Sequence, residues 1–196
     1  MNIIQIPAFT DNYFWLIHEN NKKNSVVVDP GDSKPVLEVL NKNNLVLSDI
    51  LITHHHADHI GGINELKKIY PSVNIYGPED KRIPVTVVVK DNDIIKLNSL
   101  NEKFQVMDVR GHTNSHIAYY FKNKIFCGDT LFSCGCGRLF EGSYSDMHKA
   151  LTKIKNLPKE TMVYCAHEYT LDNIGFAKIV DPNNPDLLLR EKEVKK

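Results

Sequence analysis

The sequence predicts an α/β fold in which helices and β-sheets form packed layers. Short runs of apolar and β-branched residues alternate with segments of helical apolar spacing along most of the chain. Turn-forming sequences such as D-P-G-D at positions 29–32 separate these segments. The 196 residues, of which 42% are hydrophobic, suit one domain with a substantial core. Strands that carry loops, with helices between them, are typical of a layered sandwich.

In the first half of the chain, we expect strands at residues 2–6, 12–18, 25–29 and 49–53. A helix is expected at 33–40, where Ser33 is a candidate cap and Pro35 lies near the first turn. A second helix is expected at 60–70 from its apolar spacing, and it ends before Pro71. The strand at 49–53 therefore leads directly into a histidine-rich segment.

In the second half, helices are expected at 145–154, at 171–180 and after Pro185. The sequence contains no internal repeat, low-complexity tract or linker. Strands are expected at 73–76, 86–89, 93–97, 103–109, 117–121, 124–127 and 162–165.

Composition argues against several classes of function. The 24 Lys and Arg residues balance 24 Asp and Glu residues, so a basic nucleic-acid surface is not expected. No apolar run approaches the roughly 20 residues that span a bilayer, and the N-terminal segment does not resemble a secretory signal. The cysteines lack the spacing of a disulfide framework, so we expect reduced thiols in a cytoplasmic protein. They are Cys127, Cys134, Cys136 and Cys165.

The segment T-H-H-H-A-D-H at residues 53–59 concentrates potential metal ligands after a predicted strand. Alternation along the chain places His54 and His56 on one side and His55 on the other. Asp58 and His59 then open the following helix and can face a neighbouring point. A single histidine would more often be structural, but imidazole and carboxylate in this mixed order supply parts of two metal sites. We interpret His55 as a supporting or packing residue.

Three further ligand candidates each follow a predicted strand: His112 in R-G-H-T, Asp129 in C-G-D-T and His167 in C-A-H-E-Y-T. Loops from distant parts of a sequence meet at one edge of a sheet, so we expect seven ligands to converge there. The other histidines are not assigned to metal. We expect His18 exposed at a strand end, His148 on a helix face and His116 in a supporting role after His112.

The order H-x-H-x-D-H, G-H-T, G-D-T and A-H-E-Y-T resembles the metallo-β-lactamase superfamily. The segments G-D-T-L-F-S-C-G-C-G-R-L-F-E-G-S, P-A-F-T-D-N-Y-F-W-L-I and V-V-D-P-G-D are similar to the glyoxalase II (hydroxyacylglutathione hydrolase) family, and the match extends to about Asn184. The resemblance implies an αββα four-layer sandwich of two mixed β-sheets flanked by helices. It also implies a catalytic domain at residues 1–170 and a short C-terminal helical segment at 171–196.

The resemblance also implies the metal roles. Two divalent ions can share a water and lower its pKa towards neutrality, which provides hydroxide at pH 7. Zinc is the expected metal, and the same donors suit iron and manganese. Asp129 would bridge the two ions, and Asp58 and Asp129 are the expected catalytic carboxylates. His54, His56 and His112 would bind one ion, and Asp58, His59 and His167 the other.

Thioester hydrolysis is the least demanding reaction for such a site. One ion can polarise the carbonyl while hydroxide attacks, and a thiolate whose conjugate acid has a pKa of about 8.5 leaves without much protonation. An amine leaving group would need a proton donor that the sequence does not reveal. The resemblance implies S-D-lactoylglutathione as substrate and D-lactate and glutathione as products, a reaction of methylglyoxal detoxification.

Contacts to glutathione are implied for Arg138, Tyr169, Phe140 and the backbone near Cys136 and Gly137. Arg138 is expected to bind the glycine carboxylate of glutathione as a bidentate donor, with a solvated arginine as the structural alternative. Phe140 stands where many relatives have a tyrosine, so one hydrogen bond is expected to be missing.

The family usually continues into a helical domain whose basic residues bind glutathione, whereas this sequence ends at R-E-K-E-V-K-K. Either the chain is a shortened form or it holds glutathione differently. We expect weaker handling of S-D-lactoylglutathione than in a full-length relative, because remote binding energy contributes to transition-state stabilisation.

Other functions share parts of this pattern. A persulfide dioxygenase uses one iron held by two histidines and an aspartate, which His112, Asp129 and one N-terminal histidine would supply, but F-E-G-S after G-C-G-R-L favours the hydrolase. A lactone or β-lactam hydrolase would use the same metals, but H-E-Y-T and C-G-R-L-F-E-G argue against it. A binding module with structural zinc would have a closed, cysteine-rich site. Flavin-linked diiron relatives typically have glutamate at the position of His56.

Overall fold

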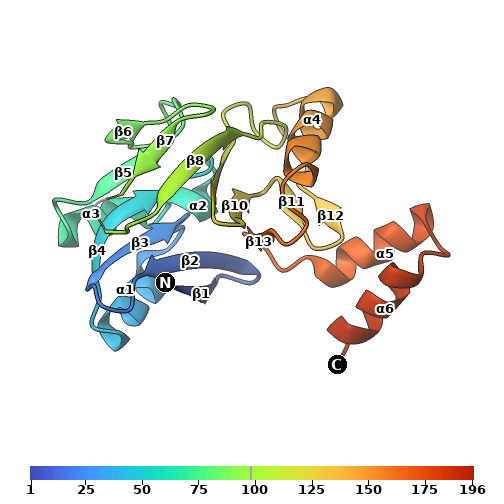
Figure 1. Ribbon diagram of the computed structural model, residues 1–196, viewed down its shortest axis with the longest axis horizontal. Coiled ribbons are helices and arrows are strands. Elements are labelled where there is room, and N and C mark those ends of the chain that lie inside the picture. Colours follow the sequence, from blue (N-terminus) through green and yellow to red (C-terminus); the bar gives the residue numbers. More distant parts are fainter. Residues whose placement is uncertain (98) are drawn as a thin grey trace.

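Two β-sheets form the centre of the molecule in the computed structural model, which describes residues 1–97 and 99–196 (Figure 1). The first sheet has the order β1-β2-β3-β4-β5-β6, in which β1 to β3 are antiparallel and β3 to β6 are parallel. Its strands are β1 (Asn2–Ala8), β2 (Asn12–His18), β3 (Asn24–Val28), β4 (Val46–Leu51), β5 (Asn74–Gly77) and β6 (Val87–Val88).

The second sheet has the order β13-β10-β9-β8-β7, with β10 and β13 parallel and the other pairs antiparallel. Its strands are β7 (Ile94–Lys96), β8 (Lys103–Asp108), β9 (Ile117–Phe121), β10 (Lys124–Gly128) and β13 (Met162–Cys165). A small hairpin of β11 (Leu131–Phe132) and β12 (Gly135–Cys136) follows β10. The helices are α1 (Ser33–Lys42), α2 (Ala57–Ile60), α3 (Ile63–Ile69), α4 (Tyr144–Lys155), α5 (Thr170–Val180) and α6 (Pro185–Val194).

Three separate apolar cores show that these elements form four layers. Alternation along each strand sends neighbouring side chains to opposite faces of a sheet. In β3, Val27 therefore packs with Leu40 of α1 and Leu66 of α3, while Val26 and Val28 pack against the second sheet. In β10, Phe126 lies in the core between the sheets, and Ile125 packs outward with Ala150 and Ile154 of α4. The predicted αββα sandwich of two mixed sheets flanked by helices is confirmed.

The structure differs locally from two of the expectations and adds one hairpin that was not expected. The cap of α1 is Asp32, whose side chain accepts a hydrogen bond from the Lys34 amide, and not Ser33. The helix expected at 60–70 is two helices, α2 and α3, separated at Gly61 and Gly62. A Cβ on Gly62 would lie 2.6 Å from the Pro30 carbonyl oxygen, so this break allows close packing on the D-P-G-D turn. The β11–β12 hairpin was not predicted, because two-residue strands leave too short a pattern.

Helices α5 and α6 form a pair that projects from the end of the sandwich beside β12 (Figure 1). The division into a catalytic segment 1–170 and a helical segment 171–196 stays a prediction, and α5 begins at Thr170. Within the described residues, no helix combines the length and the apolar character needed to cross a membrane.

Candidate metal centre

The seven candidate ligands all lie just after strands, where both sheets end at the same edge. From the first sheet, His54 and His56 follow β4, and Asp58 and His59 lie in α2. From the second sheet, the other three candidates follow β8, β10 and β13. These are His112, Asp129 and His167. The site therefore lies on the seam between the sheets, and each sheet supplies part of it.

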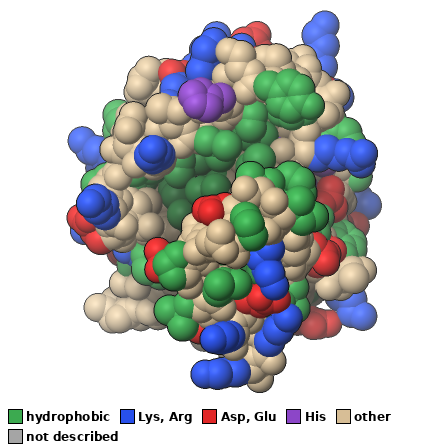
Figure 2. Space-filling view, turned by 90° about the vertical axis from the view of Figure 1, so that its right-hand side faces the viewer, with side chains coloured by type: hydrophobic (Ala, Val, Ile, Leu, Met, Phe, Trp, Pro, Cys, Tyr) green, Lys and Arg blue, Asp and Glu red, His purple; other side chains and the backbone are tan. Residues whose placement is uncertain are grey.

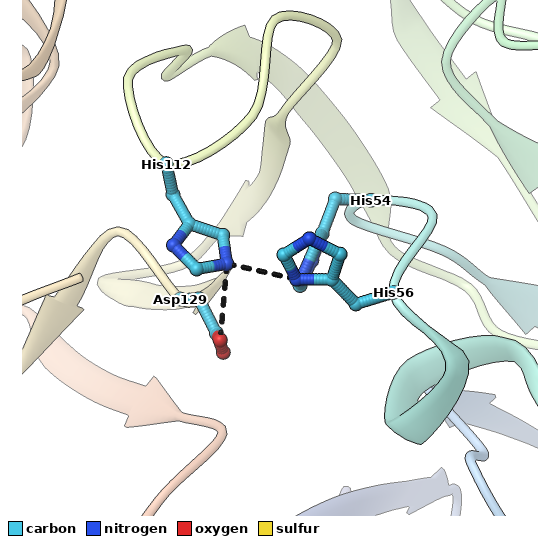
Figure 3. A group of neighbouring side chains, drawn as sticks. All are labelled: His54, His56, His112 and Asp129. Carbon is cyan, nitrogen blue, oxygen red and sulfur yellow. Dashed lines mark hydrogen bonds and ion pairs between the residues drawn. The ribbon is translucent and has the colours of Figure 1, made fainter. Parts of the chain in front are cut away.

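One group of ligand atoms consists of three imidazoles and a carboxylate (Figure 3). His54, His56, His112 and Asp129 each offer one atom, and these atoms all lie within 4.8 Å of one another. His56 Nδ1 is 3.1 Å from His54 Nε2 and 3.0 Å from His112 Nε2. Asp129 Oδ2 is 3.3 Å from His112 Nε2. Three nitrogens and one oxygen thus converge on a single point.

A second group adjoins the first and consists of Asp58, His59 and His167. Asp58 Oδ2 lies 3.4 Å from Nε2 of His59 and 3.4 Å from Nε2 of His167. Asp129 Oδ1 lies 3.3 Å from the same two nitrogens. The two oxygens of Asp129 therefore face different groups, which is the arrangement that a bridging carboxylate requires.

Hydrogen bonds on the far side of the rings fix which nitrogen of each histidine faces the site. His54 Nδ1 donates to Thr53 Oγ1 at 3.0 Å, since the Thr53 hydroxyl itself donates to Asp29 Oδ2 at 2.7 Å. His112 Nδ1 donates to the Arg138 carbonyl at 2.6 Å. His59 and His167 donate in the same way to Asp29 (3.2 Å) and Asp11 (2.7 Å). The Nε2 atoms of these four rings therefore face the site as the ligand atoms, because the acceptor of the Nδ1 proton fixes the orientation of each ring.

The donor set fits a pair of divalent ions. Among the described residues, Nε2 of His59 and Oδ1 of Asp129 are buried and have no hydrogen-bond partner. Burying polar atoms without a partner lowers the free energy of unfolding, so these two atoms favour a bound ion. Imidazole and carboxylate ligands suit zinc, iron and manganese.

The two groups differ in their protonation. Burial, together with the charges of neighbouring histidines, holds the pKa of His54 well below its usual value. Burial also lowers the pKa of His56 and of His112. In the second group, burial opposes the charged form, but the adjacent Asp129 and Asp58 carboxylates raise the pKa of His167 to about 10. The second group therefore holds protons that a metal ion must displace.

Three orienting residues were not identified from the sequence. Asp11 and Asp29 accept the Nδ1 protons described above, and Asn12 donates from Nδ2 to Asp58 Oδ2 at 2.9 Å. Asp29 ends a buried strand run and Asp11 precedes one, so both are acidic residues at strand ends, the same signal that identified Asp129. They were not recognised because no histidine or cysteine lies beside them in the sequence.

The remaining histidines are placed largely as expected. His116 is buried, stacks on the His54 ring with centroids 4.5 Å apart, and accepts a hydrogen bond from the Asp129 amide at 3.2 Å. His148 is exposed on α4. His18 ends β2 but is half-buried and not exposed, because its ring contacts the Glu19 backbone.

Residues predicted to contact substrate lie around the two groups. The Tyr169 ring stacks on His167 at 4.7 Å between centroids. The Phe140 ring is 60% exposed, and its centroid lies 5.3 Å from those of both His56 and His112. The guanidinium carbon of Arg138 is 5.8 Å from the Phe140 ring, and no carboxylate of the described chain is within ion-pair distance of Arg138. Within the described chain, Arg138 is therefore a cation without an ion-pair partner next to the Phe140 ring.

Gly137 and Cys136 have different surroundings. A Cβ on Gly137 would be 1.7 Å from the Asp129 carbonyl oxygen, so only glycine allows this close approach to the ligand loop.

Cys136 lines a cleft of about 670 Å³ on the face formed by the hairpin, α5 and α6, where Phe176 and Val180 contribute apolar walls. Figure 2 shows the hollowed, largely hydrophobic surface on this side of the molecule.

A layered sandwich with His and Asp ligands at one edge defines a metallo-β-lactamase-type protein, and the sequence model of the Metallo-beta-lactamase superfamily matches residues 9–167. The hydroxyacylglutathione hydrolase of Aliivibrio fischeri (strain MJ11) is 55% identical over 98% of this chain and 75% of that protein. The hydroxyacylglutathione hydrolase of Photobacterium profundum is 52% identical over 99% of this chain and 76% of that protein. The chain therefore belongs to the hydroxyacylglutathione hydrolase (glyoxalase II) family of this superfamily.

A solved structure agrees with the fold. The crystal structure of ETHE1 from Myxococcus xanthus matches with a TM-score of 0.77 and 30% sequence identity, covering 86% of this chain and 76% of that chain.

Proposed function

We propose that the protein hydrolyses S-(2-hydroxyacyl)glutathione thioesters, with S-D-lactoylglutathione as substrate and D-lactate and glutathione as products. The observation that carries this proposal is the position of Asp129, whose Oδ1 and Oδ2 face two different groups of ligand atoms. Membership of the hydroxyacylglutathione hydrolase family supports the substrate class. We further propose zinc as the metal, bound by the seven residues predicted from the sequence, with Asp58 and Asp129 as the catalytic carboxylates.

A pair of divalent ions supplies a hydroxide nucleophile at neutral pH and a Lewis acid for a carbonyl oxygen. The chain's own residues prepare that chemistry by orientation. Asn12 fixes Asp58, His116 fixes the Asp129 backbone, and Asp29 fixes the His59 ring. A thiolate leaving group, with a conjugate-acid pKa of about 8.5, needs little protonation, so thioester cleavage requires no additional acid at this site.

Glutathione binding is assigned to the loop that follows the hairpin and to the start of α5. Arg138 has no ion-pair partner in the described chain and can form a bidentate contact with a carboxylate. The flat, exposed Phe140 ring and the Tyr169 ring border the same site, and Cys136 and Gly137 carry the connecting backbone. Phe140 lacks the hydroxyl that a tyrosine would offer to the ligand.

The proposal is tested by measuring activity and metal content on the same sample. Hydrolysis of S-D-lactoylglutathione is followed while zinc, iron and manganese are counted in the same protein. We expect thioesterase activity with close to two ions per chain. Two bound ions without thioesterase activity would reject the substrate, and one iron with oxygen uptake on glutathione persulfide would replace the hydrolase with a dioxygenase.

The cytoplasm is the compartment that we propose, supported by four free cysteine thiols.

A further inference from the structure

A cluster of charged side chains lies next to the metal centre but contributes no ligand to it. Asp80 and Arg82 lie in the loop between β5 and β6 of the first sheet, and Glu141 lies between β12 and α4. The Arg82 guanidinium donates to Asp80 from Nε at 2.8 Å and from Nη2 at 2.7 Å, and to Glu141 from Nη1 at 2.7 Å. One cation therefore joins two carboxylates that are 59 and 2 residues away in the sequence.

Both carboxylates also bind the loop that carries His112. Asp80 Oδ2 accepts a hydrogen bond from Ser115 Oγ at 2.7 Å. Glu141 Oε2 accepts a hydrogen bond from the Asn114 amide at 2.9 Å. The Arg82 cluster, which we define as Asp80, Arg82 and Glu141, thus holds residues 114 and 115 from two directions. His112 is only two residues before Asn114 in the same loop.

The same cluster holds the loop that carries the proposed substrate residues. The Phe140 amide donates to the His112 carbonyl at 3.1 Å, and the Arg138 carbonyl accepts the His112 Nδ1 proton at 2.6 Å. Gly142 lies so close to Gly111 that a Cβ would be 2.5 Å from the Gly111 carbonyl oxygen. These contacts join residues 138–142 to the His112 loop, and Glu141 attaches both segments to Arg82.

The cluster also borders the ligand loop of the first sheet. His55 Nε2 lies 3.5 Å from Glu141 Oε1, and His55 Nδ1 lies 3.7 Å from Asp80 Oδ2. His55 separates the ligands His54 and His56 in the sequence. The cluster consequently spans the seam across which the metal centre is divided, with the β5–β6 loop and His55 on one side and the His112 loop on the other.

We propose that Arg82 is a positioning residue that ties the first sheet to the His112 loop and to residues 138–142, and thereby sets the spacing between the metal ligands and the substrate contacts. The physical reason is charge. The Asp80 side chain is 7% exposed, and hydrogen bonds from Arg82 hold the pKa of both Asp80 and Glu141 below their usual values. Without Arg82, Asp80 and Glu141 lose the guanidinium that donates to both of them, so the hydrogen-bonded connection between the loops is broken and the two carboxylates repel each other.

The chain contains a matched control. Arg110 binds Asp108 through the same D-x-R arrangement, with backbone and Nε contacts of 3.0 Å and 2.8 Å, but in the described structure it reaches no second carboxylate. The Arg82 and Arg110 side chains are similarly exposed, at 49% and 56%. Arg82→Ala and Arg110→Ala therefore remove the same local pair, and only Arg82→Ala breaks the connection across the seam.

The first measurement is amide hydrogen exchange of the metal-loaded protein. We expect Arg82→Ala, and not Arg110→Ala, to accelerate exchange at the amides of Asn114, Phe140 and Glu141. Arg82→Lys keeps the positive charge but lacks the planar guanidinium that donates to both carboxylates, so it should restore part of the protection of these amides from exchange. Equal exchange in the Arg82→Ala and Arg110→Ala proteins would overturn the proposal. This measurement does not depend on which substrate the protein hydrolyses.

The second measurement is kinetic and rests on the proposed function. Arg82→Ala should lower kcat/KM for S-D-lactoylglutathione by roughly ten- to a hundredfold, because small displacements at a catalytic site have large effects on rate. Glu141→Gln combined with Arg82→Ala should be no worse than Arg82→Ala alone, because both changes break the same connection. Additive losses in the double variant, or an unchanged kcat/KM in Arg82→Ala, would overturn the positioning role. An inactive wild-type protein would reject the proposed substrate while leaving the exchange result valid.

Discussion

Asp11 Oδ1 accepts the Nδ1 proton of His167 at 2.7 Å, across 156 residues of sequence. This contact fixes the His167 ring so that Nε2 faces Asp58 and Asp129. Orienting partners of this kind typically change metal affinity by about 10–100-fold when they are removed. We expect Asp11→Ala to weaken binding of one ion by that amount, measured by competition with a chromophoric chelator. Asp11→Asn retains an acceptor oxygen and should lose less, and equal affinities for all three proteins would contradict the role.

Asp129 is the residue on which both groups of ligand atoms depend. Its Oδ1 faces His59 and His167, and its Oδ2 faces His112. Asp129→Ala should abolish activity and release both ions, as measured by elemental analysis of the purified variant. His148→Ala, on the exposed face of α4, serves as the control and should change little. An active Asp129→Ala protein that still holds two ions would refute the bridging role.

Metal binding should release protons near neutral pH. In the metal-free protein the pKa of His167 is raised to about 10, so its ring is protonated at pH 7.5, and the carboxylates beside His59 raise the pKa of that ring as well. An ion at Asp58, His59 and His167 must displace these protons, so its affinity rises with pH until about pH 10. Calorimetric titrations in buffers of different ionisation enthalpy measure the released protons directly. No proton release at pH 7.5 would be inconsistent with these pairings.

The same shift predicts how metal-free stability depends on pH. A histidine whose pKa is higher in the folded than in the unfolded protein stabilises the fold fully below its unfolded pKa of about 6.5. That contribution is lost as pH rises through the folded pKa of His167, which is about 10. Urea unfolding of the metal-free protein at pH 6, 8 and 10 should therefore show a declining contribution from His167, which a His167→Gln variant lacks.

Gly137 and Gly175 offer a matched pair for testing the packing of the ligand loop. A Cβ on Gly137 would lie 1.7 Å from the Asp129 carbonyl oxygen, whereas a Cβ on Gly175 would have no described neighbour within 4 Å. Gly137→Ala should lower the free energy of unfolding by at least about 2 kcal/mol and reduce metal content. Gly175→Ala, inside α5, should raise the free energy of unfolding by about 0.5–1 kcal/mol. Thermal and urea unfolding of both variants measure the difference.

Arg138 provides a test of glutathione binding that is independent of the metals. Because no carboxylate of the described chain pairs with it, its removal leaves no internal charge uncompensated. Arg138→Ala should raise KM for S-D-lactoylglutathione roughly tenfold with a smaller change in kcat, and should not alter metal content. A thioester without the glycine carboxylate of glutathione should be hydrolysed equally by both proteins. An unchanged KM for the glutathione thioester would assign Arg138 to the solvated surface.

Much of the site was readable from the sequence because its signal is local. His54, His56, Asp58 and His59 fall within six residues, and His112, Asp129 and His167 each follow a strand run. The order of strands and helices was predicted closely, with strands 12–18, 117–121 and 162–165 found at the predicted bounds. The periodic spacing of apolar residues predicts such elements, because it extends over several residues. It does not reveal the two-residue strands of the hairpin or the interruption between α2 and α3.

The sequence by itself determined the types of ligand, their positions at strand ends and the alternation that sorts each strand between two cores. Only the tertiary structure decided which nitrogen of each ring faces the site, because the acceptors for the Nδ1 protons come from Asp11, Asp29 and the Arg138 backbone. It also decided that Arg82 differs from Arg110, although both occur in a D-x-R sequence. Hydrogen bonds between segments far apart in the chain depend on how the two sheets pack, and no local pattern encodes that distance.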